Sequence, residues 1–99
     1  MAKLRWSLQA AEDLEEACQY IARDSEQYAR LFAQQVMHAL KSMSRQKLPG
    51  SMVPEYGRED IRERLVYDYR LIVRVRADDR VLEVVRIFHG ARLLPPLDE

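Results

Sequence analysis

The chain has 99 residues, of which 47% are hydrophobic and 32% are charged. This composition is too apolar for a disordered segment and too charged for a membrane protein. Sixteen basic and sixteen acidic residues cancel to a formal net charge of zero, whereas proteins that bind phosphate backbones usually carry a clear basic excess. We therefore expect a single globular domain over residues 1–99 that does not bind nucleic acid directly.

Targeting and metal-binding signals are missing from the sequence. Lys3 and Arg5 stand where a signal peptide needs an apolar run, and no stretch approaches the roughly 20 apolar residues of a membrane span. We expect a cytoplasmic protein without membrane association. Cys18 is the only cysteine, and the only histidines, His38 and His89, fall in different predicted elements. We therefore expect no disulfide, no metal site and no cofactor.

The first half of the chain predicts a strand followed by two helices. Charged and apolar side chains alternate over residues 3–7, which is typical of a half-buried strand, and Ser7 is suited to cap a helix. Apolar residues then recur at helical spacing, with acidic residues such as Asp13 between them. The expected apolar stripe comprises Ala11, Leu14, Cys18 and Ile21.

A second helix is expected to begin after Asp24 and Ser25, which break the first pattern and supply capping side chains. The residues expected on its packed side recur with a period of 3.6 and comprise Tyr28, Leu31, Phe32, Gln35, Val36, Ala39, Leu40 and Met43. Pro49 and Gly50 are expected to stop it. A tight turn between the two helices makes them an antiparallel hairpin.

The second half of the chain predicts strands. Residues 51–53 form a short candidate, residues 61–66 alternate, and a turn at 67–68 leads into residues 69–76. That segment places Leu71, Val73 and Val75 on one face and Arg70, Ile72, Arg74 and Arg76 on the other, which indicates one covered and one open side. Residues 81–89 are apolar at nearly every position, as in a central strand, after a hairpin loop at 77–80. The tail, 90–99, is expected to be extended and partly ordered.

Runs of one element type favour an α+β fold over a doubly wound one. We expect an N-terminal strand and a two-helix hairpin packed on one face of a twisted, mainly antiparallel sheet of four or five strands. The opposite face is expected to be rich in arginine.

The chemistry of the candidate residues remains open at this level. His89 ends the predicted central strand near Arg86 and Arg92, and neighbouring cations favour its neutral, proton-accepting form. From the residues alone we favour the simpler alternative, in which this strand-end histidine is hydrogen-bonded to the backbone. The arginines also alternate with acidic residues, so cross-strand salt bridges on a solvated face account for most of them.

Several segments together resemble the RelE/ParE toxins of type II toxin-antitoxin systems, most closely the ParE branch. They are AEDL at 11–14, YI at 20–21, GSMVPEYG at 50–57, IRE at 61–63, YRLIVRV at 69–75 and VVRIFHGAR at 84–92. Their order and spacing cover nearly the whole chain. The resemblance implies the fold reached above, no cofactor, and a cognate ParD-like antitoxin with a ribbon-helix-helix DNA-binding part, in a heterotetramer or larger complex.

The resemblance divides function in two. ParE-like members inhibit DNA gyrase, and in them the last strand and C-terminal segment are implicated, which here places target contacts at His89, Arg92, Leu93 and Leu94. RelE-like members cut messenger RNA on the ribosome, for which His89 with Arg62, Arg70 and Arg86 would imitate a catalytic site. The net charge of zero favours a ParE-like function, since binding to the ribosome is stronger for a protein with a basic surface.

The antitoxin is expected on the arginine-rich face, where Arg62, Arg70 and Arg74 would meet an acidic segment. Open strand edges also suit a wrapping peptide. An inactive family member that serves only as an interaction module is the third alternative. A short upstream gene for a ribbon-helix-helix protein would favour a toxin over such a relic.

Overall fold

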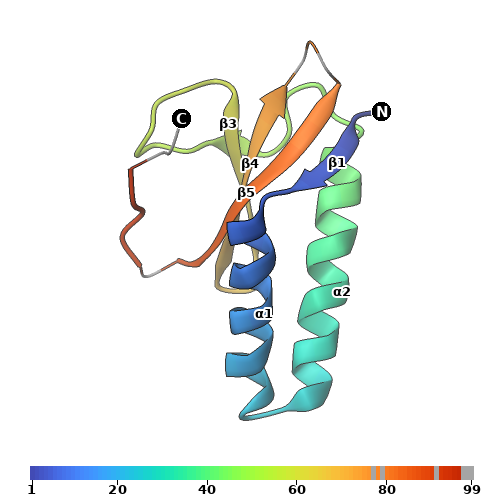
Figure 1. The fold of residues 1–99 in the computed structure, drawn as a ribbon, viewed down its shortest axis with the longest axis vertical. Helices are drawn as coiled ribbons and strands as arrows, with labels where there is room; N and C mark the ends of the chain where they lie inside the picture. Colours follow the sequence, from blue (N-terminus) through green and yellow to red (C-terminus); the bar gives the residue numbers. More distant parts are fainter. Residues whose placement is uncertain (77, 79, 91, 97–99) are drawn as a thin grey trace.

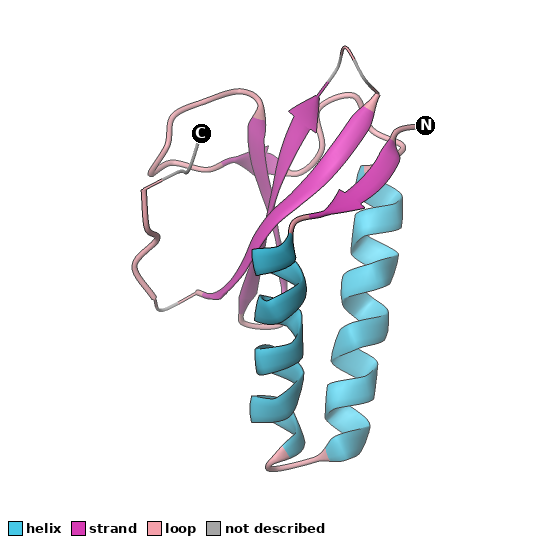
Figure 2. Ribbon diagram, in the orientation of Figure 1, coloured by secondary structure: helices cyan, strands magenta, loops and turns pink. Residues whose placement is uncertain are grey.

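The computed structural model describes residues 1–76, 78, 80–90 and 92–96. It confirms the α+β fold, with two helices against one face of a five-stranded sheet (Figures 1 and 2). The elements are β1 (Lys3–Trp6), α1 (Leu8–Ala22), α2 (Glu26–Met43), β2 (Ser51–Met52), β3 (Ile61–Val66), β4 (Tyr69–Arg76) and β5 (Val81–His89). No helix in the described part of the chain combines the length and the apolar character needed to cross a membrane.

The sheet is mixed, with the order β1-β5-β4-β3-β2. Strands β2 to β5 pair antiparallel, while β1 pairs parallel to β5. The helical hairpin carries the chain from β1 at one edge of the sheet to β2 at the opposite edge. The strands from β2 to β5 then return one by one as antiparallel neighbours, and β5 ends beside β1 and parallel to it. Strand β5 therefore lies inside the sheet, between β1 and β4, as the apolar run predicts.

Both helix starts agree with the capping residues in the sequence. The Ser7 hydroxyl accepts the Ala10 N–H at 3.0 Å and the Ser25 hydroxyl accepts the Tyr28 N–H at 3.1 Å. The stripe expected for α1 is wrong at Ala11, which is exposed. Ala10, Asp13 and Ala17 are its buried residues, while Leu14, Cys18 and Ile21 pack beside them only partly buried.

The expected stripe and end of α2 are corrected too. Ala29 is buried, whereas Tyr28, Leu31 and Gln35 are exposed. The helix ends at Met43, ahead of Pro49 and Gly50. The Ser44 hydroxyl donates to the Lys41 carbonyl at 2.7 Å and so satisfies one carbonyl of the last turn.

Gly50 has a different role from stopping the helix. It has a φ of +59°, and a Cβ there would collide with the Glu63 carbonyl of β3. Only a glycine fits this approach of the chain to β3.

Two apolar clusters lie on opposite faces of the sheet. The larger joins both helices to strand residues such as Leu71, Val73 and Val84. The smaller comprises Val53, Ile61, Ile72 and Phe88. The expectation of an open arginine face is therefore wrong for its middle, where Ile72 is fully buried and the segment before β3 covers it.

Two predictions fall partly outside the described residues. In the loop expected at 77–80, positions 77 and 79 are not described. In the tail expected at 90–99, positions 91 and 97–99 are not described. Of the described part, Leu94 packs against the smaller cluster.

Candidate functional site

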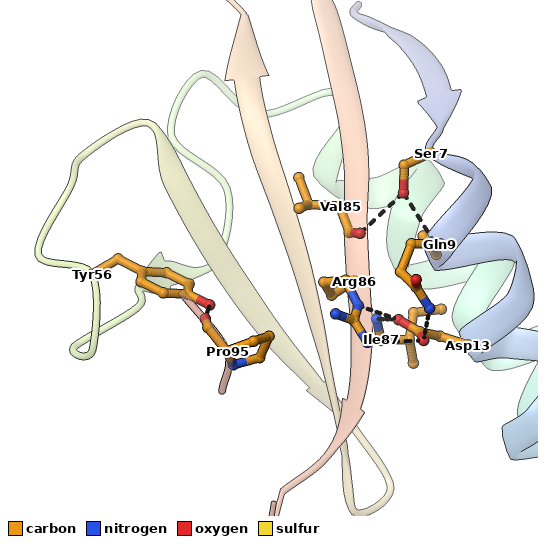
Figure 3. A network of polar contacts seen from close by, with 9 residues as sticks. Ser7, Gln9, Asp13, Tyr56, Val85, Arg86, Ile87 and Pro95 are labelled. Carbon is orange, nitrogen blue, oxygen red and sulfur yellow. Dashed lines mark hydrogen bonds and ion pairs between the residues drawn. The ribbon is translucent and has the colours of Figure 1, made fainter. Parts of the chain in front are cut away.

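The C-terminal half of β5 is flanked on its outer edge by α1 instead of by another strand. The β1–β5 pairing ends with Trp6 opposite Val84. Past that point the Ser7 hydroxyl donates to the Val85 carbonyl at 3.0 Å, and the Ile87 N–H donates to the Asp13 carboxylate at 2.9 Å (Figure 3). Side chains of the helix thus replace a missing strand partner, as buried backbone groups require.

Asp13 is the centre of this contact. Its carboxylate accepts from Arg86 Nε at 2.8 Å, from Arg86 Nη2 at 3.2 Å and from Gln9 at 3.1 Å (Figure 3). Only 7% of the Asp13 side chain is exposed. The Arg86 guanidinium also lies over the Phe88 ring, 4.1 Å from its centroid. Asp13 and Arg86 therefore join α1 to both the edge and the far face of β5.

A groove of about 530 Å³ lies between α1 and the end of β5. Its lining includes Arg86, His89 and Arg92 on one side, and Gln9, Glu16, Gln19, Tyr20 and Arg23 of the helical segment on the other. The groove holds charges of both signs, which suits a polar protein segment better than an apolar ligand.

His89 lies on the helix side of the sheet. Its ring stands edge-on to that of Tyr69, with 5.3 Å between the ring centroids and 83° between the ring planes, and Tyr69 packs against the larger, helix-side cluster. Beyond it the chain turns outward, with Arg92 exposed and Leu93 95% exposed. Leu94 turns back onto the smaller cluster.

A hydrogen bond from Tyr56 holds the C-terminal segment at Pro95. The Tyr56 hydroxyl donates to the Pro95 carbonyl at 2.6 Å (Figure 3). The C-terminal segment is thus anchored at both ends of its described part, by the β5 terminus and by the turn that carries Tyr56.

Arg70 is held by two carboxylates on the face away from the helices. It donates to Glu55 at 2.6 and 2.9 Å and to Glu63 at 2.6 Å. These hydrogen bonds from Arg70 lower the pKa of Glu55 to about 2. Because Arg70 is only 12% exposed, its main role is to connect β4 to the turn before β3. Its charge is largely occupied by the two carboxylates.

The structure does not bring Arg62, Arg70 and Arg74 onto one surface. Arg62 pairs with Val73, whose side chain belongs to the helix-side cluster. It donates to the carbonyls of Pro49 at 2.9 Å and Gly50 at 3.2 Å. Arg70 and Arg74 lie on the other face.

The sequence matches the family model described as "ParE toxin of type II toxin-antitoxin system, parDE" over residues 4–94. The chain belongs to the ParE toxin family. A solved structure described as "Chromosomal ParDE TA system from P. aeruginosa" contains a chain with a TM-score of 0.70 and 20% sequence identity. The similarity covers 90% of this chain and 96% of that one and, at this identity, shows the fold alone. No curated protein matches the sequence.

The resemblance to the ParE branch is thus confirmed, and this ParE-family chain does not gather the residues considered for RNA cleavage. His89 and Arg62 lie on the helix side, and Arg70 lies on the opposite face, where Glu55 and Glu63 hold it. Arg86 is paired with Asp13. Among the described residues, no three His, Cys, Asp or Glu side chains group as metal ligands would.

Sequence reasoning missed Asp13, because it counted this residue among the acids of an exposed helix face. The available signal was its spacing. Asp13 lies three residues after Ala10 and four before Ala17, so the three share one side of a helix. Two alanines on that line allow the helix to approach β5 closely.

Proposed function

We propose that this ParE-family toxin inhibits DNA gyrase by binding it as a protein, without catalysing a reaction. The observation that carries the proposal is the engagement of the arginines: Arg86 is bound by Asp13, and Arg70 by Glu55 and Glu63. Cleavage of RNA needs uncommitted cations around the scissile phosphate. The formal net charge of zero supports a protein target over the ribosome. Acting on gyrase places the toxin in the cytoplasm.

The proposed target contacts are His89, Arg92, Leu93 and Leu94. Leu93 is accessible to a partner, because it is 95% exposed. Leu94 packs against the smaller cluster and Tyr56 holds Pro95, so Leu93 is presented from a defined segment, which lowers the ordering cost of binding.

The proposed antitoxin is ParD-like, with a ribbon-helix-helix DNA-binding part, in a heterotetramer or larger complex. Its acidic segment would contact Arg62, Arg70 and Arg74. Because the Glu55 side chain is 44% exposed, an antitoxin carboxylate can exchange with it on Arg70. Arg62 lies on the other side of the sheet, so the segment would wrap around an edge to reach both.

Messenger-RNA cleavage is the second candidate, favoured by the groove that brings His89, Tyr69 and Arg92 together. A histidine and a tyrosine beside a cation are the residue types of acid-base chemistry at a phosphate. In this alternative the groove, rather than the exposed C-terminal segment, is the active surface.

A gyrase supercoiling reaction run beside a translation-dependent messenger-RNA cleavage reaction tests the proposal. We expect gyrase-trapped linear DNA and intact messenger. Leu93→Asp should abolish inhibition, whereas Leu48→Asp, at another exposed leucine, should leave it unchanged. Cut messenger with normal supercoiling, lost on His89→Ala, would instead favour the ribonuclease.

A further inference from the structure

Four of the five tyrosines line one pocket at the end of the sheet. The pocket has a volume of about 430 Å³ and lies where α1, α2 and the β3–β4 turn meet. Its tyrosines are Tyr20, Tyr28, Tyr67 and Tyr69. Both helices extend past the sheet at this end (Figure 1). The pocket therefore lies between the β3–β4 turn and the residues at the end of α1 and the start of α2.

The exposure of these rings is not explained by the fold. Tyr20 and Tyr28 are each 62% exposed and Tyr67 is 52% exposed. Aromatic rings usually bury most of their area in a core or an interface. An exposed aromatic group of this size therefore points to a binding surface.

The backbone at Tyr67 is the second observation. Tyr67 and Asp68 form a two-residue hairpin loop, and Tyr67 has a φ of 52°. A bulky side chain at positive φ is a rare and strained choice where such turns favour glycine or asparagine. Strain of this kind persists where the side chain serves a purpose. The Tyr67 ring reaches Phe32 at 5.8 Å but remains about half exposed.

The charge of the pocket indicates what it binds. Among the described residues that line it, Asp68 is the one carboxylate and His89 the one histidine, and none is a lysine or an arginine. The Asp68 carbonyl accepts the Gly90 N–H at 2.6 Å, which fixes the turn against the end of β5. Tyrosine faces attract cations, and Arg23 already lies over Tyr20, with Cζ 5.9 Å from the ring centroid.

We propose that this tyrosine pocket binds a basic side chain, an arginine or a lysine, presented by a protein partner. The rings supply the faces over which the cation lies, and Asp68 supplies the counter-charge. This deepens the proposed function, on which it rests for the existence of a partner, by naming the chemistry that the partner presents. It also separates two surfaces, because an acidic segment suits the arginines and a basic side chain suits this pocket.

The test uses small probes and so does not depend on gyrase or an antitoxin. N-acetyl-arginine amide is titrated into the full-length protein while amide NMR shifts are followed. We expect saturable shifts at Tyr20, Tyr28 and Tyr67. Binding should be about tenfold tighter than for N-acetyl-citrulline amide, which has nearly the same shape without the charge. Equal binding of citrulline amide, or tighter binding of N-acetyl-leucine amide, would overturn the proposal.

Variants separate the pocket from the rest of the chain. Tyr67→Gly removes a ring and suits the positive φ, and Tyr28→Leu removes another from an exposed helix position; each should weaken arginine binding at least fivefold. Tyr56→Phe, at the tyrosine outside the pocket, should leave it unchanged. Shifts that survive Tyr28→Leu would count against the pocket. Arginine binding without gyrase inhibition would retain the pocket and overturn only the proposed target.

Discussion

At the scale of single residues, Asp13 is a polar group on which the joining of α1 to the sheet depends. Truncating it to alanine leaves the Ile87 N–H and the Arg86 guanidinium without their carboxylate partner. Breaking a largely buried ion pair from one side typically costs about 3–5 kcal/mol. Since Arg86 is 25% exposed and can recover water, we expect Asp13→Ala to lower the free energy of unfolding by about 2–4 kcal/mol.

Urea unfolding measures this loss, with Glu12→Ala as the control on the same helix. Glu12 is exposed, so its removal should change stability by about 0.5 kcal/mol or less. Asp13→Asn, which keeps one acceptor, should fall between the two. Equal stability of the Asp13→Ala and Glu12→Ala variants would show that the network contributes nothing.

The carboxyl of Glu55 gives the molecule a pH dependence. Hydrogen bonds from Arg70 lower its folded-state pKa from 4.5 to about 2. A depressed pKa means that the stabilisation is present above the unfolded value of 4.5 and is lost as pH falls towards 2. Because this side chain is 44% exposed, solvent screening limits the effect to about 1 kcal/mol or less.

The measurement compares the wild type with Glu55→Gln in urea at a series of pH values. We expect the wild type to be more stable at pH 7 and the difference to shrink between pH 5 and pH 2. A difference that stays constant over that range would show that Glu55 titrates normally in the folded chain.

At the scale of elements, the two helix caps form a matched pair. Both serines accept an N–H from the third residue of their helix, and Ser7 also donates, to the Val85 carbonyl. Loss of an N-cap costs about 0.5–2 kcal/mol. We expect Ser7→Ala to cost about 1 kcal/mol more than Ser25→Ala, because it also removes a hydrogen bond to β5.

Thermal and urea unfolding of both variants test this difference. Ser7→Thr serves as a further control, since a threonine retains the hydroxyl that both contacts use. If the two alanine variants are equally stable, the bond between Ser7 and β5 adds nothing to the cap.

Strands were more predictable than helix faces, for a physical reason. The bounds of β3 and β4 follow from a period of two, those of β5 from its nearly continuous apolar run, and all three from the turns between them. In α1 the side that packs is set by alanines and by Asp13, whose burial depends on Arg86, 73 residues later in the chain. The stripe expected from hydrophobicity therefore includes the exposed Ala11 and omits the buried Ala10, Asp13 and Ala17. Likewise, the alternation over residues 69–76 predicts that Ile72 is exposed, but the segment that contains Val53 covers it.

At the scale of the whole molecule, the proposed contacts fall on both faces of the sheet. The helix side carries the tyrosine pocket and His89, and the far side carries Arg70 and Arg74. Sequence reasoning found the arginines and the end of β5. It did not find the pocket, because its tyrosines come from three separate parts of the chain that only the fold brings together.

Salt dependence tests the proposed antitoxin contacts at Arg62 and Arg70 while the overall charge of the toxin is held constant. Arg62→Ala with Arg70→Ala removes two positive charges from a chain of net charge zero, giving −2. Arg45→Ala with Lys47→Ala, both at exposed positions after α2, gives the same net charge. General repulsion of an acidic antitoxin is therefore equal in the two double variants, and only local contacts differ.

We expect the first double variant to bind the antitoxin about tenfold more weakly in low salt than the second, because close charge pairs each contribute up to about 1 kcal/mol. The gap should narrow near 0.15 M salt, where the screening length falls to about 8 Å. Calorimetric titration gives the affinities. Thermal unfolding at the same pH checks that loss of the contacts to Glu55 and Glu63 leaves the chain folded. Equal affinity of the folded double variants at every ionic strength would place the antitoxin elsewhere on the toxin.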